Sequence, residues 1–169
     1  LRRRYERGEF VGEPKDDEFQ VFPTLWVMAA QQRWKDQNAK KPGPPENLEM
    51  TAMGVDIAQG GADRTVLAPR YGDWFDNLIT RAGKDTPDGP TAAGLIIMHL
   101  RDAAQVNLDF GGGWGSSAYD HLKGNELVSI LPVVPSAAST GKSKCGKYKF
   151  RNLRADMAWT LREALDPSS

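Results

Sequence analysis

The sequence has 169 residues, which suits a single domain with an additional segment, and 40% of them are hydrophobic, enough to build a core. Lysine plus arginine and aspartate plus glutamate each number 22, so the zero net charge argues against a protein that binds nucleic acid through overall basicity. The lone cysteine, Cys145, excludes an internal disulfide and a cysteine-based zinc site, and no apolar run is long enough to span a membrane.

The N-terminal part is expected to lie outside the main domain. Residues 1–23 are polar and of mixed charge, and a short helix is predicted over residues 25–35 with Thr24 as its N-terminal cap. Three prolines and a glycine follow within residues 40–49, and they interrupt both helices and strands. This stretch is therefore predicted to be a linker.

The linker divides the chain into two parts. We expect residues 1–50 to be an N-terminal extension and linker, and residues 51–169 to form the domain proper. Because the sequence begins with a basic, polar stretch rather than with methionine, we expect it to be a fragment of a longer protein.

From residue 51 onward the pattern indicates alternating strands and helices. Strands are predicted at 51–58 and 64–71, followed by a short apolar stretch around Trp74 and by a loop over 80–90. The remaining predictions are a helix over 92–103 capped by Thr91, a strand at 105–110, a helix at 118–124, a strand at 127–134, a flexible loop over 136–149 and a final helix over 150–165. This order predicts an α/β fold, a mixed sheet of about five or more strands with helices on both faces.

Asp56 is the first candidate functional residue. Met53, Val55 and Ile57 share one face of the first strand, and Asp56 lies on the opposite face among small residues. A carboxylate in the middle of a sheet is costly unless something pairs with it, and a metal ion would do so. The alternative is an aspartate at the end of a strand that caps the next turn.

Two further aspartates occupy comparable positions. Asp109 ends a predicted strand just before three glycines, and ligands of open sheets bind at the carboxyl ends of strands. Its alternative role is that of an ordinary turn residue. Asp156 lies on the final helix, beside the apolar stripe of Leu153, Met157 and Leu161, and could face the sheet. Its alternative role is that of a solvated helix charge.

Together the three aspartates suit metal-assisted hydrolysis of phosphodiesters. Two divalent cations can activate a water and stabilise the leaving oxygen, and Mg²⁺ favours carboxylate ligands. His99 and His121 fall on predicted helices and are expected to be structural or surface residues. Since the sequence suggests no pairing of serine or cysteine with histidine, water is the expected nucleophile.

A basic stretch near the C-terminus is a candidate DNA-binding segment, and a solvated loop is its alternative. The side chains expected to contact phosphates are Lys142, Lys144, Lys147, Lys149 and Arg151. Tyr148 lies among them and adds a surface on which a base could stack. Residues 136–143 approximate a phosphate-binding loop, but the first glycine is missing and the following glycine disfavours the required helix.

Four segments in this order resemble the nuclease domain of bacteriophage terminase large subunits, over roughly residues 51–167. They read GVDIAQGGADRTVLAPRYGDWF, TPDGPTAAGLI, VNLDFGGGWGSSAYDHL and KFRNLRADMAWTLREALDP. The earlier segment EFQVFPTLWVMAAQQRW is similar to the part of those proteins that joins the packaging ATPase to the nuclease. The ordered set carries the resemblance, since no single motif is specific.

The resemblance implies a ribonuclease H-like fold and an endonuclease that cuts concatemeric viral DNA with Mg²⁺ or Mn²⁺. The family's acidic triad maps to Asp56, Asp109 and Asp156, and Asp63 resembles an accessory acidic position that supports the metal ligands. The implied partners are double-stranded DNA and, in the full-length protein, an ATPase domain, the portal and the small terminase subunit. The implied location is the cytoplasm of the host bacterium, with no role for a membrane.

Two other functions remain open from the sequence. The segment VDIAQGGADRT resembles the phosphate-binding hairpin of actin-like phosphotransferases and ATPases, although those enzymes need two such domains. The other possibility is a non-catalytic domain that binds DNA or protein and whose carboxylates only cap turns. Cation-dependent cleavage of DNA would separate these functions from a nuclease.

Overall fold

The computed structural model describes residues 16–17, 20–111 and 113–168, and its centre is a six-stranded mixed sheet. The strand order is β3-β2-β1-β5-β6, and β4 pairs with β2 on the same side as β3. The central strands β1, β5 and β6 are parallel, whereas β2 is antiparallel to β1. The strands are β1 (Ala52–Asp56), β2 (Arg64–Tyr71), β3 (Trp74–Phe75), β4 (Ile79–Ala82), β5 (Gln105–Asp109) and β6 (Ile130–Val133). The predicted mixed α/β sheet is confirmed.

The predicted loop over residues 80–90 is wrong in its first part. Residues Ile79–Ala82 form β4, which pairs with the first half of β2, and a short 3₁₀ helix, η1 (Gly83–Asp85), follows. This edge strand is short and has no fully buried residue, so it lacks the alternating apolar pattern that marks a strand in a sequence. Its backbone pairing with β2 stabilises it instead.

Helix ends differ from the predictions where capping was misassigned. Helix α3 (Gly89–His99) begins earlier than expected because Asp88, rather than Thr91, caps it by accepting a hydrogen bond from the Thr91 amide at 2.9 Å. Helix α2 (Thr24–Lys40) includes Thr24, whose amide donates to the carboxylate of Asp16. Helices α4 (Ser116–Leu122) and α5 (Leu153–Leu165) follow, and α5 is capped by Asn152. None of the helices in the described residues is long and apolar enough to cross a membrane.

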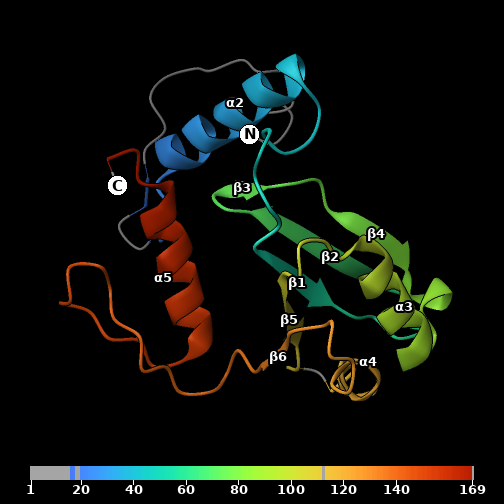
Figure 1. The fold of residues 1–169 in the computed structure, drawn as a ribbon. Helices are drawn as coiled ribbons and strands as arrows, with labels where there is room; N and C mark the ends of the chain where they lie inside the picture. Colours follow the sequence, from blue (N-terminus) through green and yellow to red (C-terminus); the bar gives the residue numbers. More distant parts are fainter. Residues whose placement is uncertain (1–15, 18–19, 112, 169) are drawn as a thin grey trace.

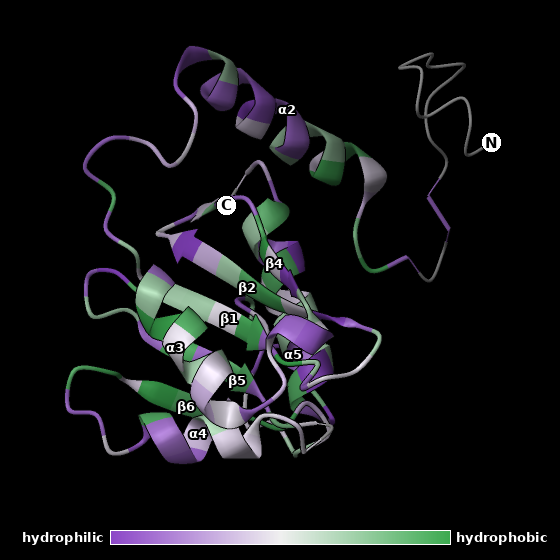
Figure 2. Ribbon diagram, turned by 90° about the vertical axis from the view of Figure 1, so that its right-hand side faces the viewer, coloured by the Kyte–Doolittle hydropathy of each residue, from purple (hydrophilic) through white to green (hydrophobic). Residues whose placement is uncertain are grey.

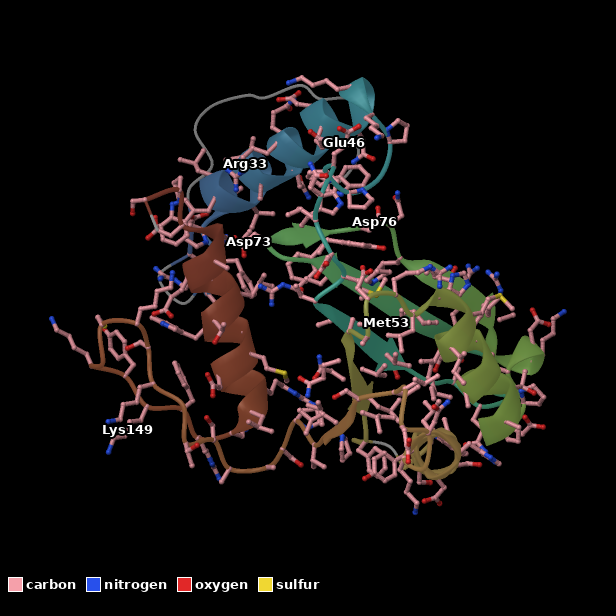
Figure 3. All side chains as sticks on the ribbon, in the orientation of Figure 1. Arg33, Glu46, Met53, Asp73, Asp76 and Lys149 are labelled. Carbon is pink, nitrogen blue, oxygen red and sulfur yellow. The ribbon has the colours of Figure 1, made fainter. Side chains whose placement is uncertain are left out.

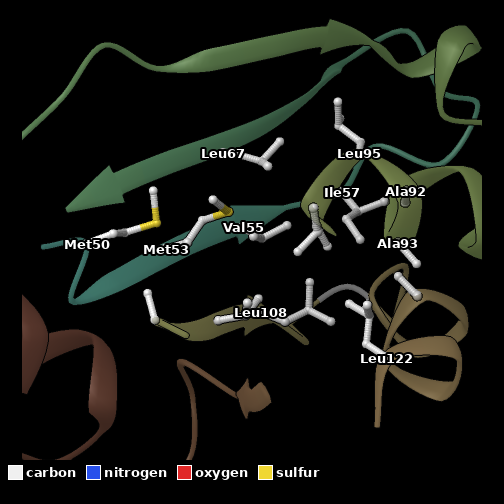
Figure 4. Packing of buried hydrophobic residues seen from close by; sticks show 14 residues of the cluster. Met50, Met53, Val55, Ile57, Leu67, Ala92, Ala93, Leu95, Leu108 and Leu122 are labelled. Carbon is white, nitrogen blue, oxygen red and sulfur yellow. The ribbon is translucent and has the colours of Figure 1, made fainter. Parts of the chain in front are cut away.

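The hydrophobic core lies between one face of the sheet and helices α3 and α4 (Figure 4). The predicted inward face of β1 is confirmed, because Met53, Val55 and Ile57 are all buried. Leu108 of β5 and Ile96 of α3 pack into the same cluster, also away from solvent. Burial of these side chains is the main force that holds β1 and β5 in place.

Helices α3 and α5 lie on opposite sides of the sheet (Figure 1), as the predicted arrangement requires. The two sides are unequal, because α3 contributes several buried residues and α5 has none. Strands β5 and β6 are hydrophobic, whereas α2 is largely hydrophilic (Figure 2). The sheet is thus densely packed on the α3 side and loosely covered on the α5 side.

Helix α2 contacts the rest of the molecule through aromatic side chains. The rings of Trp34 and Trp74 stack with centroids 5.9 Å apart, and the Trp34 indole donates to the Phe75 carbonyl at 3.0 Å. No residue of α2 is fully buried. Met50, by contrast, is buried and its amide donates to the carboxylate of Asp102 at 2.7 Å. The chain therefore enters the core at Met50, and the domain boundary placed there stays a prediction.

Candidate functional site

Asp56 and Asp109 lie side by side at the carboxyl ends of two parallel strands. The pairing of β1 with β5 runs to Val55 opposite Leu108, and each aspartate is the next and last residue of its strand. Both side chains are exposed, on the face of the sheet opposite the core. The sheet thus brings together two carboxylates that are 53 positions apart in the sequence, Asp56 and Asp109.

The pKa of the Asp56 carboxyl is raised above its ordinary value. Partial burial is the largest cause, and the negative charges of Asp109 and then Asp63 raise this pKa further. Asp63 belongs to the turn between β1 and β2, where its carbonyl accepts a hydrogen bond from the Gly83 amide at 2.9 Å. Two negative charges therefore act on the Asp56 carboxylate at this end of the sheet, and a bound cation would relieve that repulsion.

The hydrogen bonds distinguish Asp56 from an ordinary turn cap. In the turn that follows β1, the Ala58 amide donates to the hydroxyl of Thr65 at 3.1 Å, so this donor does not need Asp56. Within the described residues, no hydrogen bond or ion pair engages the Asp56 carboxylate. Asp109 does cap its turn, because its Oδ1 accepts from the Gly111 amide at 2.7 Å. That bond fixes the orientation of the Asp109 carboxylate beside Asp56.

The structure does not bring Asp156 into this group. Its Oδ2 accepts a hydrogen bond from the hydroxyl of Ser139 at 2.5 Å, and a Cβ added to Gly141 would overlap the same carboxylate. Among the described residues, no three histidine, cysteine, aspartate or glutamate side chains lie close enough together to hold a metal ion. The convergence of all three predicted aspartates therefore stays a prediction.

The orientation of α5 explains the position of Asp156. Asp156, Trp159 and Glu163 share a stripe of the helix, and each contacts the segment between β6 and α5. The stripe predicted to be the core face instead leaves Met157 46% and Leu161 40% exposed. The helix thus turns its acidic stripe toward the preceding segment and leaves part of its apolar stripe uncovered.

The predicted DNA-contacting residues all occur in one exposed region. Lys142, Lys144, Lys147, Lys149 and Arg151 are exposed, and the region lies beyond α5, away from the sheet (Figure 1). Figure 3 shows Lys149 there, far from Met53 in the core. Residues 136–143 lead into this basic region rather than into a helix, so the structure lacks the helix that a phosphate-binding loop requires.

Ser139 is the functional candidate that the sequence did not reveal. Its hydroxyl donates to Asp156 and also accepts a hydrogen bond from the Gly141 amide at 2.8 Å. Serine is common in loops, and the contact joins residues 17 positions apart, Ser139 and Asp156. No local sequence pattern marks such a pair.

Asp56→Asn is expected to stabilise the metal-free protein at neutral pH, raising its melting temperature by a few degrees. A raised folded-state pKa means that the folded protein holds this proton more tightly than the unfolded chain. Stability therefore falls as the pH rises from the unfolded-state pKa of this carboxyl through its raised folded-state pKa. Thermal unfolding in EDTA should show the gain at pH 7.5 and its loss at the acid end of this window. A melting temperature at pH 7.5 below that of the parent would contradict this prediction.

No protein-family model matches this sequence, and no curated protein does. Solved structures do match, over 89% of this chain and 69% of theirs. The nuclease domain of the large terminase subunit of bacteriophage Sf6 is 16% identical in sequence, with a TM-score of 0.51. A point mutant of it with calcium gives a TM-score of 0.54 at 16% identity, and one with manganese and β-thujaplicinol gives 0.53, also at 16% identity. The chain therefore has the ribonuclease H-like fold of phage terminase nuclease domains.

Proposed function

We propose that this chain is a divalent-metal-dependent endonuclease that cuts double-stranded DNA, and that it acts as the nuclease part of a phage terminase large subunit. The observation that carries the proposal is the pair Asp56 and Asp109 at the carboxyl ends of β1 and β5. The fold shared with terminase nuclease domains and the order of the four resembling segments support the same assignment.

The paired carboxylates fit a hard divalent cation. Mg²⁺ binds through one or two carboxylates and keeps several waters. The pKa of Asp56 is raised first by partial burial and then by the negative charges of Asp109 and Asp63, and a bound cation would favour the charged form of all three carboxylates. Asp56 and Asp109 would hold the ion, and Asp63 would add to the negative field around it. Such an ion lowers the pKa of water and stabilises charge on the leaving oxygen. Solved structures of the similar Sf6 domain contain manganese or calcium.

We propose Asp156 as the third acidic residue, completing a site for two Mg²⁺ or Mn²⁺ ions. To join the other two, it must leave Ser139, and α5 must approach the open face of the sheet. The exposed apolar side chains of Met157 and Leu161 on α5 favour such an approach, because it would remove them from water. Asp156 then differs from the other two aspartates in depending on the position of a helix.

The exposed basic side chains from Lys142 to Arg151 are proposed to contact DNA phosphates. In the full-length protein the partners would be an ATPase domain, the portal and the small terminase subunit, in the cytoplasm of the infected bacterium. The non-catalytic alternative explains the turn-capping bond of Asp109 but leaves Asp56 without a role.

Supercoiled plasmid provides the test. The full chain should nick and linearise plasmid in Mn²⁺ or Mg²⁺ and should leave it intact in EDTA, because the carboxylates act only through a cation. Equal cleavage in EDTA, or none with either metal at any protein concentration tested, would contradict the proposal.

A further inference from the structure

The basic region contains a hairpin, not the flexible loop that the sequence predicts. Lys142 and Lys149 form an antiparallel bridge, and two hydrogen bonds of 3.1 Å join the backbone of Ser143 to Tyr148 and the Tyr148 amide to the Ser143 hydroxyl. Ser143 is buried at the centre, and Gly146 makes the turn with a positive φ of 74°. We refer to residues 142–149 as the basic hairpin.

Helix α5 holds the basic hairpin in one orientation. The carboxylate of Glu163 accepts hydrogen bonds from the Lys144 amide at 2.9 and 3.2 Å and from the Trp159 indole at 2.8 Å. The ring of Tyr148 rests on Trp159, with centroids 5.2 Å apart. Arg162 lies over the ring of the same Trp159, 4.8 Å from its centroid. One side of the Tyr148 ring therefore packs against Trp159, which in turn contacts Arg162.

The supported ring is nevertheless open to solvent. Tyr148 is 54% exposed, although tyrosine is large and partly apolar. Around it are four exposed lysines of the hairpin and, just beyond, two exposed arginines, with no acidic residue from 142 to 154. Within the described residues, no ion pair neutralises these six cations.

This combination suits a ligand that carries both phosphates and accessible aromatic faces. Lysines attract the phosphates of a nucleic acid whatever its base sequence. An exposed aromatic ring offers a surface on which any base can stack. A duplex hides the faces of its bases, whereas an unpaired strand exposes them. The lysines alone would be enough to bind the phosphates of a duplex. The exposed ring of Tyr148 is therefore the feature that favours a strand with unpaired bases.

We propose that Tyr148 is a stacking site for an unpaired base of single-stranded DNA, with the lysines of the basic hairpin on the adjacent phosphates. The choice of DNA as the nucleic acid rests on the function proposed above. Figure 1 shows the segment that contains the basic hairpin on the far side of α5 from β1 and β5, so we assign the stacked base to a position away from the paired carboxylates.

Binding in EDTA tests the proposal separately from cleavage. Fluorescence anisotropy of the full chain would use a labelled oligothymidine and a blunt duplex of the same length. Tyr148→Leu should weaken oligothymidine binding about tenfold, the size of one base–aromatic stack. Duplex binding and the salt dependence of both should stay unchanged, because Tyr148 carries no charge. Tyr148→Phe should bind as the parent does.

Phe75→Leu is the matched control, since Phe75 is also a half-exposed aromatic ring beside a guanidinium but lies on β3. It should bind both DNAs as the parent does. The proposal is overturned if Tyr148→Leu binds oligothymidine like the parent, if it weakens both DNAs equally, or if an acidic peptide competes as well as oligothymidine does.

Plasmid cleavage by the same preparations separates the two proposals. Cleavage by the parent together with full oligothymidine binding by Tyr148→Leu would overturn the stacking site and leave the nuclease assignment standing. Binding of oligothymidine that depends on Tyr148, without cleavage in Mn²⁺ or Mg²⁺, would support the stacking site and contradict the nuclease assignment.

Discussion

Asp56→Asn is expected to lower the rate of plasmid cleavage in Mn²⁺ by at least about 100-fold, because a cation supplies several kcal/mol of transition-state stabilisation. The substitution keeps the size and shape of the side chain and removes the charge that would hold the cation. Asp56 is expected to matter most of the three aspartates, since it lies on a central strand with a buried inner face and has both Asp109 and Asp63 nearby. The measurement is the initial rate of nicking on supercoiled plasmid.

The same variant separates loss of chemistry from loss of fold. Its melting temperature in EDTA should be no lower than that of the parent, for the electrostatic reason given above, and it should keep most of its duplex affinity. Mn²⁺ should raise the melting temperature of the parent, because a ligand of the folded state stabilises it, and should raise that of Asp56→Asn much less. Cleavage by Asp56→Asn at the parental rate would falsify the assignment of Asp56 as a metal ligand.

The second large effect is expected from neutralising the basic hairpin. Replacing Lys142, Lys144 and Lys147 with glutamine should weaken duplex binding equally for all sequences. It should also reduce the slope of log affinity against log salt by about two to three, since each lost phosphate contact contributes roughly 0.9. The backbone bonds that shape the hairpin do not involve these side chains, so the hairpin should persist. Binding would be measured in EDTA at a series of salt concentrations.

A control with the same change in charge is available elsewhere. Lys35, Lys40 and Lys84 are also exposed, on α2 and η1, and their replacement with glutamine changes the net charge by the same amount. This triple variant should keep the parental salt slope. Equal slopes in the two triple variants would mean that overall charge, rather than the basic hairpin, governs DNA binding.

Several features of the fold could be predicted from local patterns. The alternation in residues 51–58 identified the buried face of β1 and placed Asp56 on the opposite face, as the structure confirms. The strand predicted over residues 105–110 is likewise observed, as β5, which ends one residue earlier at Asp109. Such patterns are reliable where a strand packs against a core, since burial then selects every second residue.

Features that depend on partners remote in sequence were missed. Strand β4 exists because β2 offers it a backbone edge, and the basic hairpin is held against α5 because Glu163 accepts a hydrogen bond from the Lys144 amide. Backbone hydrogen bonds of this kind need no particular side chain on the segment that they order. The sequence of each segment therefore gave no reason to expect order.

The sequence by itself determined the α/β class, the inner faces of the central strands and the candidacy of three aspartates. Only the tertiary structure decided which aspartates meet. Parallel pairing of β1 with β5 places Asp56 beside Asp109, and this register follows from the packing of Met53, Val55 and Leu108 in one core. The rotation of α5 directs Asp156 to Ser139, because no buried apolar stripe fixes that helix to the sheet. Helical periodicity names the residues that share a stripe, but contacts from the rest of the molecule choose which stripe faces inward.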